Sequence, residues 1–162
     1  NDGVFYRSCS WQSSTDLRIA HRFLFEMCGF VAVISKSNRP VDFQKVQQMN
    51  YDIIHRGPDD SGYWGEDWCS VGVRRLSILD LSEHGHQPLF DPTGTYFIVY
   101  NGEVYNYSQL RTQLEGDGVD FKSSSDTEVV LQSFIRWGEN CADRLSGMFA
   151  FIIVNIKCKR NP

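Results

Sequence analysis

Cys28, in the segment Met27-Cys28-Gly29, is the residue of this chain that could become an unusually reactive nucleophile. If Met27 and the residues before it are removed, Cys28 carries both a thiol and a free α-amine, whose ordinary pKa is roughly 7.7–8.0. The amine can then take up the thiol proton near neutral pH, and the resulting thiolate is the species that attacks acyl carbon atoms. A cysteine before an apolar segment also fits ordinary buried packing, so the choice depends on the rest of the chain.

The remaining cysteines and histidines do not form a metal or redox motif. His84 and His86 lie in a loop-forming segment without a nearby third ligand, which indicates solvated side chains. The cysteines are odd in number, widely spaced and without a Cys-x-x-Cys pair, which favours a reduced, cytoplasmic setting. They are Cys9, Cys28, Cys69, Cys141 and Cys158.

Length, composition and charge limit the classes of function. With 162 residues, of which 41% are hydrophobic and 14% aromatic, the chain can bury one sizeable core, so we expect one domain. The net charge of −4 comes from mixed charges without a basic run, which argues against nucleic acid or an anionic membrane as a partner. No apolar segment is long enough to span a membrane, and a small anionic or zwitterionic substrate remains compatible.

The first part of the chain differs from the rest. Residues 1–26 mix serine, glutamine, arginine and aromatic residues without a clear period. We therefore expect residues 1–27 to be an N-terminal extension outside the fold, residues 28–156 to form the domain, and residues 157–162 to be an irregular tail.

Apolar segments with β-branched residues, and three- to four-residue apolar spacing, indicate the elements that must position Cys28. A helix with Phe43, Val46, Met49 and Ile53 on its inner face should cover a sheet. The expected strands cover residues 29–35, 62–65, 69–74, 95–100 and 148–154, and the expected helices cover residues 43–53, 106–115 and 125–137.

The dipeptide Asn101-Gly102 follows an expected strand, where it usually forms a tight hairpin turn. Here Asn106 can cap a helix that starts immediately afterwards, with Leu110 and Leu114 on one face. A strand, Asn-Gly and a helix in direct succession do not form a two-stranded hairpin.

Ser125 and Glu128 fit a capping box at the start of the last expected helix, which should end at Gly138. Asp126, in the first turn, also fits simple complementarity to the helix dipole. The residues expected to face the core are Val130, Leu131, Phe134 and Ile135.

A series of segments, in one order, resembles the N-terminal glutaminase domain of glutamine-hydrolysing asparagine synthetases, which are class II glutamine amidotransferases. The similarity runs from Met27 to about Asn155, and the Arg74-Arg75-Leu76-Ser77 segment favours this branch over the glucosamine-phosphate synthases. The segments are Met27-Cys28-Gly29, His55-Arg56-Gly57-Pro58-Asp59, Arg75-Leu76-Ser77-Ile78-Leu79-Asp80, Gln87-Pro88-Leu89, Asn101-Gly102-Glu103-Val104-Tyr105-Asn106, Ser125-Asp126-Thr127-Glu128 and Gly147-Met148-Phe149-Ala150-Phe151.

The resemblance implies an α+β fold of the N-terminal-nucleophile hydrolase type, a four-layer αββα sandwich of two antiparallel sheets, here truncated at its C-terminal end. It also implies a set of catalytic positions, with Cys28 as the nucleophile and Asn101 and Gly102 as the oxyanion hole. The implied substrate-binding positions are Arg75 for the glutamine carboxylate, Glu103 and Asp126 for the α-amine, and Ile78 and Leu79. Arg56 and Asp59 are interpreted as loop-forming residues.

The departures from the family pattern matter equally. While Cys28 is preceded by residues 1–27 its nitrogen is an amide and cannot act as a base, so the chain is expected to be inactive unless it is processed to Cys28. The resemblance implies no cofactor for glutamine hydrolysis, and an ATP- and magnesium-dependent synthetase domain, a ligase, beyond residue 162. The alternative is a catalytically silent fragment that only binds glutamine or a protein partner. The ammonia acceptor and the oligomeric state are left open.

Overall fold

The computed structural model describes residues 4–8, 28–35, 39–76 and 86–157. Ile78, Leu79 and His84, which were singled out in the sequence, lie outside the described residues. The strands are β1 (Val4–Ser8), β2 (Gly29–Ile34), β3 (Asp60–Glu66), β4 (Cys69–Arg75), β5 (Leu89–Phe90), β6 (Tyr96–Val104) and β7 (Gly147–Asn155). The helices are α2 (Phe43–Asp52), α3 (Tyr107–Gly116) and α4 (Asp126–Trp137), with the short 3-10 segments η1 (Ile54–Arg56) and η3 (Gly138–Arg144).

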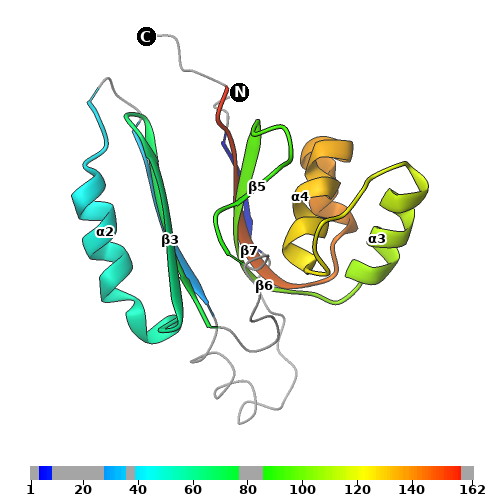
Figure 1. Cartoon of the computed structure of the whole chain (residues 1–162), viewed down its shortest axis with the longest axis horizontal. Helices are drawn as coiled ribbons and strands as arrows, with labels where there is room; N and C mark the ends of the chain where they lie inside the picture. The colour runs from blue at the N-terminus through cyan, green and yellow to red at the C-terminus, as the bar shows by residue number, and fades with distance from the viewer. Residues whose placement is uncertain (1–3, 9–27, 36–38, 77–85, 158–162) are drawn as a thin grey trace.

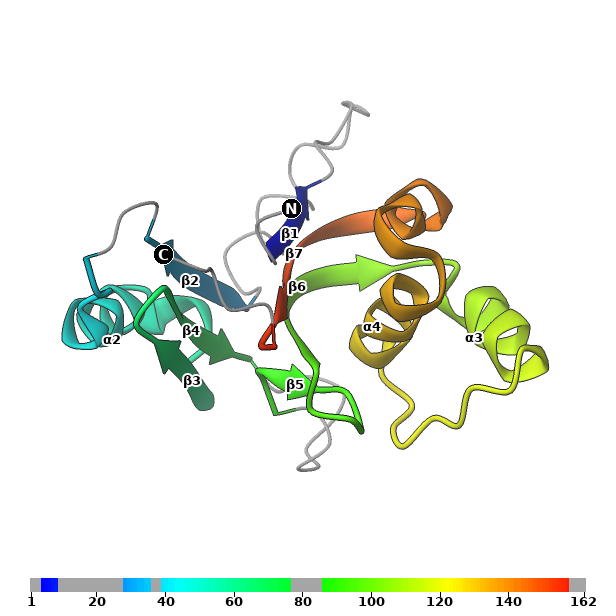
Figure 2. The same cartoon turned by 90° about the horizontal axis from the view of Figure 1, so that it is seen from above.

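Two antiparallel sheets pack face to face between helices (Figure 1). One sheet has the strand order β1-β7-β6-β5, and the other has the order β2-β4-β3. Helix α2 lies against β2 and β4, whereas α4 lies against β6 and α3 packs on α4 (Figure 2). This arrangement confirms the expected α+β, four-layer αββα sandwich.

The side-chain alternation of β6 divides the interior into two cores. Phe97 and Val99 point into the cluster between the two sheets. Ile98 and Tyr100 point the other way, into the cluster between the larger sheet and the helices. By the same alternation, Asn101 lies on the face of β6 that is turned toward the smaller sheet.

Helix α2 buries only part of the predicted face: Val46 faces inward as predicted, but Phe43 and Met49 do not. Val46 and Asn50 are completely buried, whereas Phe43 and Met49 are 38% and 43% exposed. Asn50 can face the sheet because its Nδ2 donates a hydrogen bond to the Val73 carbonyl at 3.3 Å. Apolar spacing alone does not reveal this, because the inward-facing residue is polar and its cost of burial is offset by the hydrogen bond.

Strand β6 continues through Asn101-Gly102 to Val104, beyond the predicted end of the strand. Asn106 precedes α3, but its side chain makes no cap for that helix. Instead its Nδ2 donates to the Arg144 carbonyl and its Oδ1 accepts from Ser146 N, both at 2.9 Å. Asn106 thereby joins the start of α3 to the segment before β7.

Helix α4 has the predicted bounds. The Ser125 hydroxyl accepts a hydrogen bond from Glu128 N at 3.3 Å, and Gly138 ends the helix with a φ of 62°. Val130 and Leu131 are buried as predicted, but Ile135 is 42% exposed, so its predicted inward position is wrong.

The N-terminal segment differs from its prediction as well. The sequence places residues 1–27 outside the fold, but Val4–Ser8 forms β1 and pairs antiparallel with β7, from Val4 opposite Val154 to Ser8 opposite Ala150. A strand that is paired on one side only presents unsatisfied backbone groups along the other side. β1 occupies that edge of β7, and β6 occupies the opposite edge.

Candidate active site

The residues singled out in the sequence gather at one end of the sandwich. Cys28 directly precedes β2, and Gly29 pairs with Arg74 in β4, so Cys28 lies beside the end of β4. Strand β2 also lies against β6. In Figure 1, β3 begins at the lower end of the smaller sheet, and its first residue, Asp60, pairs with Arg75 at the end of β4. The end of β6, which leads to α3, lies at the lower end of the larger sheet.

The Cys28 thiol is half-buried and lies against the residue that follows Arg75. Leu76 N donates a hydrogen bond to Cys28 Sγ at 3.3 Å, and Sγ is 3.8 Å from the Leu76 carbonyl oxygen. Arg56 Nη2 donates to the Cys28 carbonyl at 3.4 Å. The nucleophile candidate is thus fixed through both its side chain and its backbone.

Arg56 contacts Cys28, which the sequence interpretation does not predict. The sequence interprets it as a loop former, and it lies in the turn η1, from which its guanidinium contacts the Cys28 carbonyl. A Cβ added at Gly29 would lie 3.1 Å from Ile53 Cδ1 and 3.4 Å from Arg56 Cβ. Periodicity cannot reveal this contact because it depends on η1, which brings Arg56 back to the start of β2. The available signal was the Arg-Gly-Pro-Asp segment itself.

The loop from Gly57 to Asp59 lies directly on the backbone of β4. A Cβ at Gly57 would lie 2.5 Å from both Arg74 C and Arg75 N, so no larger residue fits without a backbone shift. Asp59 N donates to the Arg75 carbonyl at 3.2 Å. This close approach holds the position of Arg75.

Asp60 places a negative charge next to Arg75, its partner across the β3–β4 pair. Burial alone would raise the pKa of the Asp60 carboxyl, but the hydrogen bond from His86 at 2.8 Å, the Ser61 amide and the nearby Arg75 charge together lower that pKa. Asp60 therefore stays ionised at neutral pH, and the site contains charges of both signs.

The open edge of β6 carries the candidate oxyanion donors. Tyr100 N donates to Gln87 Oε1 at 2.6 Å, and Val104 N donates to Asp126 Oδ2 at 3.1 Å. Alternate N–H groups of a strand point to the same side, so the Gly102 N–H lies between these two, on the edge turned away from β7. Both neighbours on that edge are occupied by side-chain acceptors, and among the described residues no side-chain acceptor is assigned to the Gly102 N–H, which is therefore the candidate donor for a ligand oxygen.

Gly102 has a backbone that only glycine adopts readily here. Its φ is 143°, and a Cβ would lie 2.1 Å from the Met148 carbonyl oxygen. Asn101, next to it, has a buried Oδ1 with no hydrogen-bond partner in the described part of the chain. An unpaired buried amide oxygen calls for an additional polar partner, such as a ligand or water.

Asp126, in the first turn of α4, reaches back to both sides of this segment. Its Oδ2 accepts from Tyr100 Oη at 2.7 Å as well as from Val104 N. Glu103, between them, is exposed to solvent. The structure therefore brings together Cys28 with Arg75, and Asn101, Gly102 and Glu103 with Asp126, at the same end of the molecule.

Two other classes of site find no support among the described residues. Within residues 4–8, 28–35, 39–76 and 86–157, no group of three or more His, Cys, Asp or Glu side chains is placed to hold a metal ion. Over the same ranges, no helix combines the length and the apolar character needed to cross a membrane.

A cysteine at the start of a strand, in a sandwich of two antiparallel sheets covered by helices, defines the class of N-terminal-nucleophile hydrolases. A family model described as a glutamine amidotransferase domain matches residues 27–161, and the chain belongs to this family. A solved structure titled as the allosteric regulatory enzyme of purine biosynthesis superimposes with a TM-score of 0.50 at 25% identity, over 80% of this chain and 29% of that one.

Curated relatives are asparagine synthetases. "Asparagine synthetase [glutamine-hydrolyzing] 1" of Bacillus subtilis (strain 168) is 46% identical over 132 residues, which cover 80% of this chain and 21% of the relative. "Asparagine synthetase [glutamine-hydrolyzing] 3" of Arabidopsis thaliana is 34% identical over 134 residues, 82% of this chain and 23% of the relative. The chain thus spans about a fifth of the length of these relatives.

Proposed function

We propose that this chain is a glutaminase domain, which hydrolyses the side-chain amide of L-glutamine once Cys28 is the first residue. The observation that carries the proposal is the half-buried Cys28 thiol at the end of β4, which carries Arg75, at the same end of the sandwich as the Gly102 N–H on the edge of β6 turned away from β7. Membership of the glutamine amidotransferase family supports the same substrate.

The reaction follows from these groups. The free α-amine of Cys28 takes up the thiol proton, and the thiolate attacks the side-chain amide carbon of glutamine. Asn101 Nδ2 and Gly102 N–H donate to the oxygen of the resulting tetrahedral intermediate, where negative charge develops. The protonated amine returns its proton to the leaving nitrogen, ammonia departs, and water then cleaves the thioester to give glutamate and free Cys28.

Substrate recognition is assigned to charged groups around this centre. Arg75 pairs with the α-carboxylate of glutamine through its guanidinium, which suits bidentate contact with a carboxylate. Glu103 and Asp126 accept hydrogen bonds from the α-amine. Ile78 and Leu79 complete the proposed substrate-binding set.

The proposed use of the ammonia rests on the relatives' names. We propose that it is passed to an ATP-dependent synthetase domain, with asparagine synthesis as the overall reaction. ATP and magnesium belong to that second domain, and the glutaminase step needs neither. A cytoplasmic setting agrees with the reduced cysteines that the chemistry requires.

A second candidate is a silent domain that binds glutamine without hydrolysing it. The observation in its favour is β1, because this strand makes residues before Cys28 part of the larger sheet. While residue 27 remains bonded to Cys28, the Cys28 nitrogen is an amide and cannot take up the thiol proton.

The experiment that separates the two uses a protease site introduced directly before Cys28. Glutamate and ammonia released from L-glutamine are measured before and after cleavage, with Cys28→Ser as the control. The proposal predicts turnover only in the cleaved chain with Cys28. A cleaved, folded chain that binds glutamine without turnover would instead establish the silent alternative.

A further inference from the structure

The Asp126 carboxylate connects two positions of β6 that lie four residues apart, Tyr100 and Val104. Its Oδ2 accepts from the Tyr100 hydroxyl at 2.7 Å and from Val104 N at 3.1 Å. The segment between these two contacts is Asn101, Gly102 and Glu103, which contains both proposed oxyanion donors. A single carboxylate oxygen thus spans the segment from the helical side of the sheet.

Tyr100 is well placed to hold this bridge. Its ring is buried in the core between the larger sheet and the helices, and the residue is only 4% exposed. Burial, followed by the Asp126 charge and the hydrogen bond to it, raises the Tyr100 pKa far above its ordinary value. The hydroxyl therefore keeps its proton at all relevant pH values and remains the donor to Asp126.

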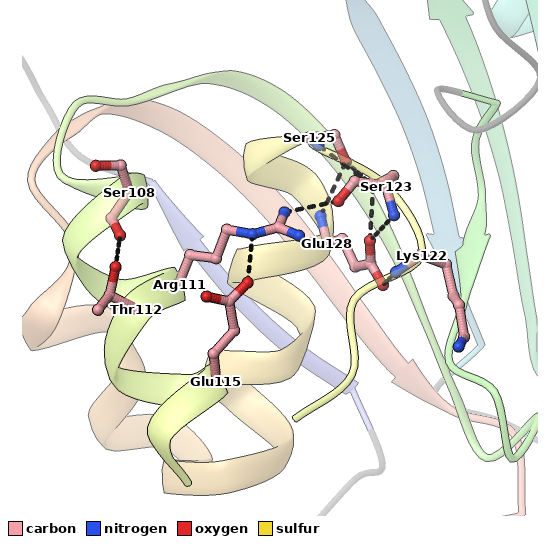
Figure 3. A network of polar contacts seen from close by, with 8 residues as sticks. All are labelled: Ser108, Arg111, Thr112, Glu115, Lys122, Ser123, Ser125 and Glu128. Atoms are coloured by element: carbon pink, nitrogen blue, oxygen red, sulfur yellow. Dashed lines mark hydrogen bonds and ion pairs between the residues drawn. The ribbon is translucent and has the colours of Figure 1, made fainter. Parts of the chain in front are cut away.

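Asp126 itself is anchored by the helix on which it lies, and not by β6 alone. Figure 3 shows the network that holds the start of α4. The buried Glu128 carboxylate accepts from Lys122 N at 2.9 Å and from Ser123 N at 2.7 Å, and the Ser125 hydroxyl accepts from Glu128 N. Arg111, on α3, donates to the Ser123 carbonyl at 2.6 Å. The bridge therefore connects a fixed helix terminus to the strand.

Only one bond of the bridge comes from a side chain of β6. Val104 contributes its backbone N–H, which any residue at that position except proline supplies, whereas Tyr100 contributes a hydroxyl that depends on its residue type. The sheet face also holds a second tyrosine, Tyr96, whose ring packs on Phe134 at a centroid distance of 5.7 Å. Within the described residues, the Tyr96 hydroxyl makes no such contact with Asp126.

We propose that Tyr100 is a positioning residue for glutamine hydrolysis, whose hydroxyl holds Asp126 across the Asn101–Glu103 segment and thereby fixes the oxyanion donors. The inference rests on the proposed function, in which Asn101 Nδ2 and Gly102 N–H stabilise the transition state. Donors of this kind act because they are already oriented before charge develops. Loosening them therefore lowers kcat more than it raises KM.

The test compares Tyr100→Phe with Tyr96→Phe in the full chain cleaved before Cys28. Each variant loses one hydroxyl from the same face of the same strand. Tyr100→Phe is expected to lower kcat for L-glutamine about tenfold and to raise KM by a smaller factor, because Asp126 also accepts from the α-amine. The same loss in kcat is expected with 4-carbamoylbutanoate, which lacks the α-amine, because the bridge acts on the oxyanion donors. Tyr96→Phe should match the parent with both substrates.

Hydrogen exchange supplies a readout that does not depend on turnover. In Tyr100→Phe the Val104 amide should exchange about tenfold faster than in Tyr96→Phe, with exchange in β4 unchanged. If Tyr100→Phe has the same kcat as the parent, or if only its KM rises, Tyr100 is not a positioning residue. Unchanged Val104 exchange also overturns it. An inactive parent with faster Val104 exchange in Tyr100→Phe would contradict the proposed function and leave the bridge itself supported.

Discussion

Arg74 and Arg75 are adjacent in the chain but lie in opposite environments. Arg74 is 9% exposed, and its Nε donates at 3.0 Å to the carbonyl of Asn50, near the C-terminal end of α2. That contact satisfies a helix-terminal carbonyl and places a positive charge at the negative end of the helix dipole. Arg75 is half-buried beside Cys28 and Asp60. The first arginine thus stabilises the fold, and the second belongs to the proposed site.

This difference predicts opposite results for two matched substitutions. Arg75→Lys keeps the charge but loses the bidentate geometry, so kcat/KM for L-glutamine should fall about tenfold or more with little change in Tm. Arg74→Lys should lower Tm with little effect on kcat/KM of the folded protein. Alternation along β4 would have suggested that Arg74 tolerates the change, because it reveals the direction of the side chain but not its buried hydrogen bond.

Kinetics and thermal melts of both variants provide the check. An analogue of glutamine without the α-carboxylate should be a poor substrate of the parent, and Arg75→Lys should not lower kcat/KM for this analogue any further. A lower Tm in Arg75→Lys with normal use of glutamine would show that Arg75 is structural.

Gly102 and Gly94 offer a second matched pair. Both have positive φ, 143° and 62°, but a Cβ at Gly94 meets nothing within 4 Å, whereas at Gly102 it would lie 2.1 Å from the Met148 carbonyl oxygen. Gly102→Ala should therefore lower the free energy of unfolding by about 3 kcal/mol or more, and Gly94→Ala by about 1 kcal/mol. Urea denaturation measures both, and equal costs would mean that β7 does not approach Gly102 this closely.

Much of the candidate site could be predicted at the level of residue identity, because the motifs around Cys28, Arg75 and Asn101 are contiguous in the sequence. Their proximity in space could not, because it depends on the β2–β4 register and on the packing of two sheets. Arg56 and Cys28, which form a hydrogen bond, are separated by 28 positions in the sequence. Tyr100 and Asp126, which also form a hydrogen bond, are separated by 26 positions, so no local sequence pattern predicts either contact.

At the scale of elements, the turn between β5 and β6 is organised by a single carboxylate. Asp91 is 6% exposed. It accepts from Thr93 N at 2.9 Å, Thr95 N at 2.7 Å and Tyr96 N at 2.6 Å, and also from the Thr93 hydroxyl. Burial raises the Asp91 pKa, but these hydrogen bonds outweigh burial and lower it below the ordinary value. The turn aligns the start of β6, the strand that carries Asn101 and Gly102.

A lowered pKa in the folded state gives a stabilising contribution that is present above the ordinary carboxyl pKa, about 4, and is lost as pH falls through the folded value. Asp91→Asn should therefore lower the free energy of unfolding by about 1–3 kcal/mol at pH 7, and by less below about pH 4. Urea denaturation from pH 3 to pH 7 tests this, with the exposed Asp120→Asn as control. If the loss in free energy of unfolding caused by Asp91→Asn is as large at acidic pH as at pH 7, the Asp91 charge does not have the assigned role.

The elements themselves were largely predictable, because strong apolar segments specify β2, β4, β6 and β7, and capping residues specify α4. The buried face of α2 was predictable only at Val46, because the other buried residue is Asn50, which faces the sheet through a hydrogen bond, whereas Met49 is partly exposed. The prediction that the Asn106 side chain caps α3 was wrong for a related reason, because this side chain forms hydrogen bonds with the segment before β7 instead. In both cases a long-range polar contact overrides the local pattern.

On the scale of the whole molecule, β1 links the N-terminal segment to the domain. It pairs with Ala150–Val154 in β7, on the side opposite β6. Such pairing was not predictable, because residues 1–26 show no clear period and an edge strand needs only backbone groups to add to a sheet. Residues before Cys28 thus contribute to the architecture that holds the proposed site.

Deletion of residues 1–8 should expose the edge of β7 to other chains. We expect a lower Tm and concentration-dependent association, because an unpaired edge strand pairs readily with a second copy. Light scattering and thermal melts, compared with the complete chain over the same concentration range, measure the effect. Identical behaviour of the two chains would show that β1 contributes nothing to stability or solubility.

The central claim is that Cys28 becomes a nucleophile toward glutamine when its amine is free, and trapping the covalent intermediate tests it most directly. The full chain, cleaved before Cys28, is mixed with L-glutamine, quenched in acid and analysed by intact mass and peptide mapping. A glutamyl thioester on Cys28 is predicted, absent from the uncleaved chain and from Cys28→Ser. A thioester on another cysteine, or turnover of glutamine by cleaved Cys28→Ser at the parent rate, would contradict the account.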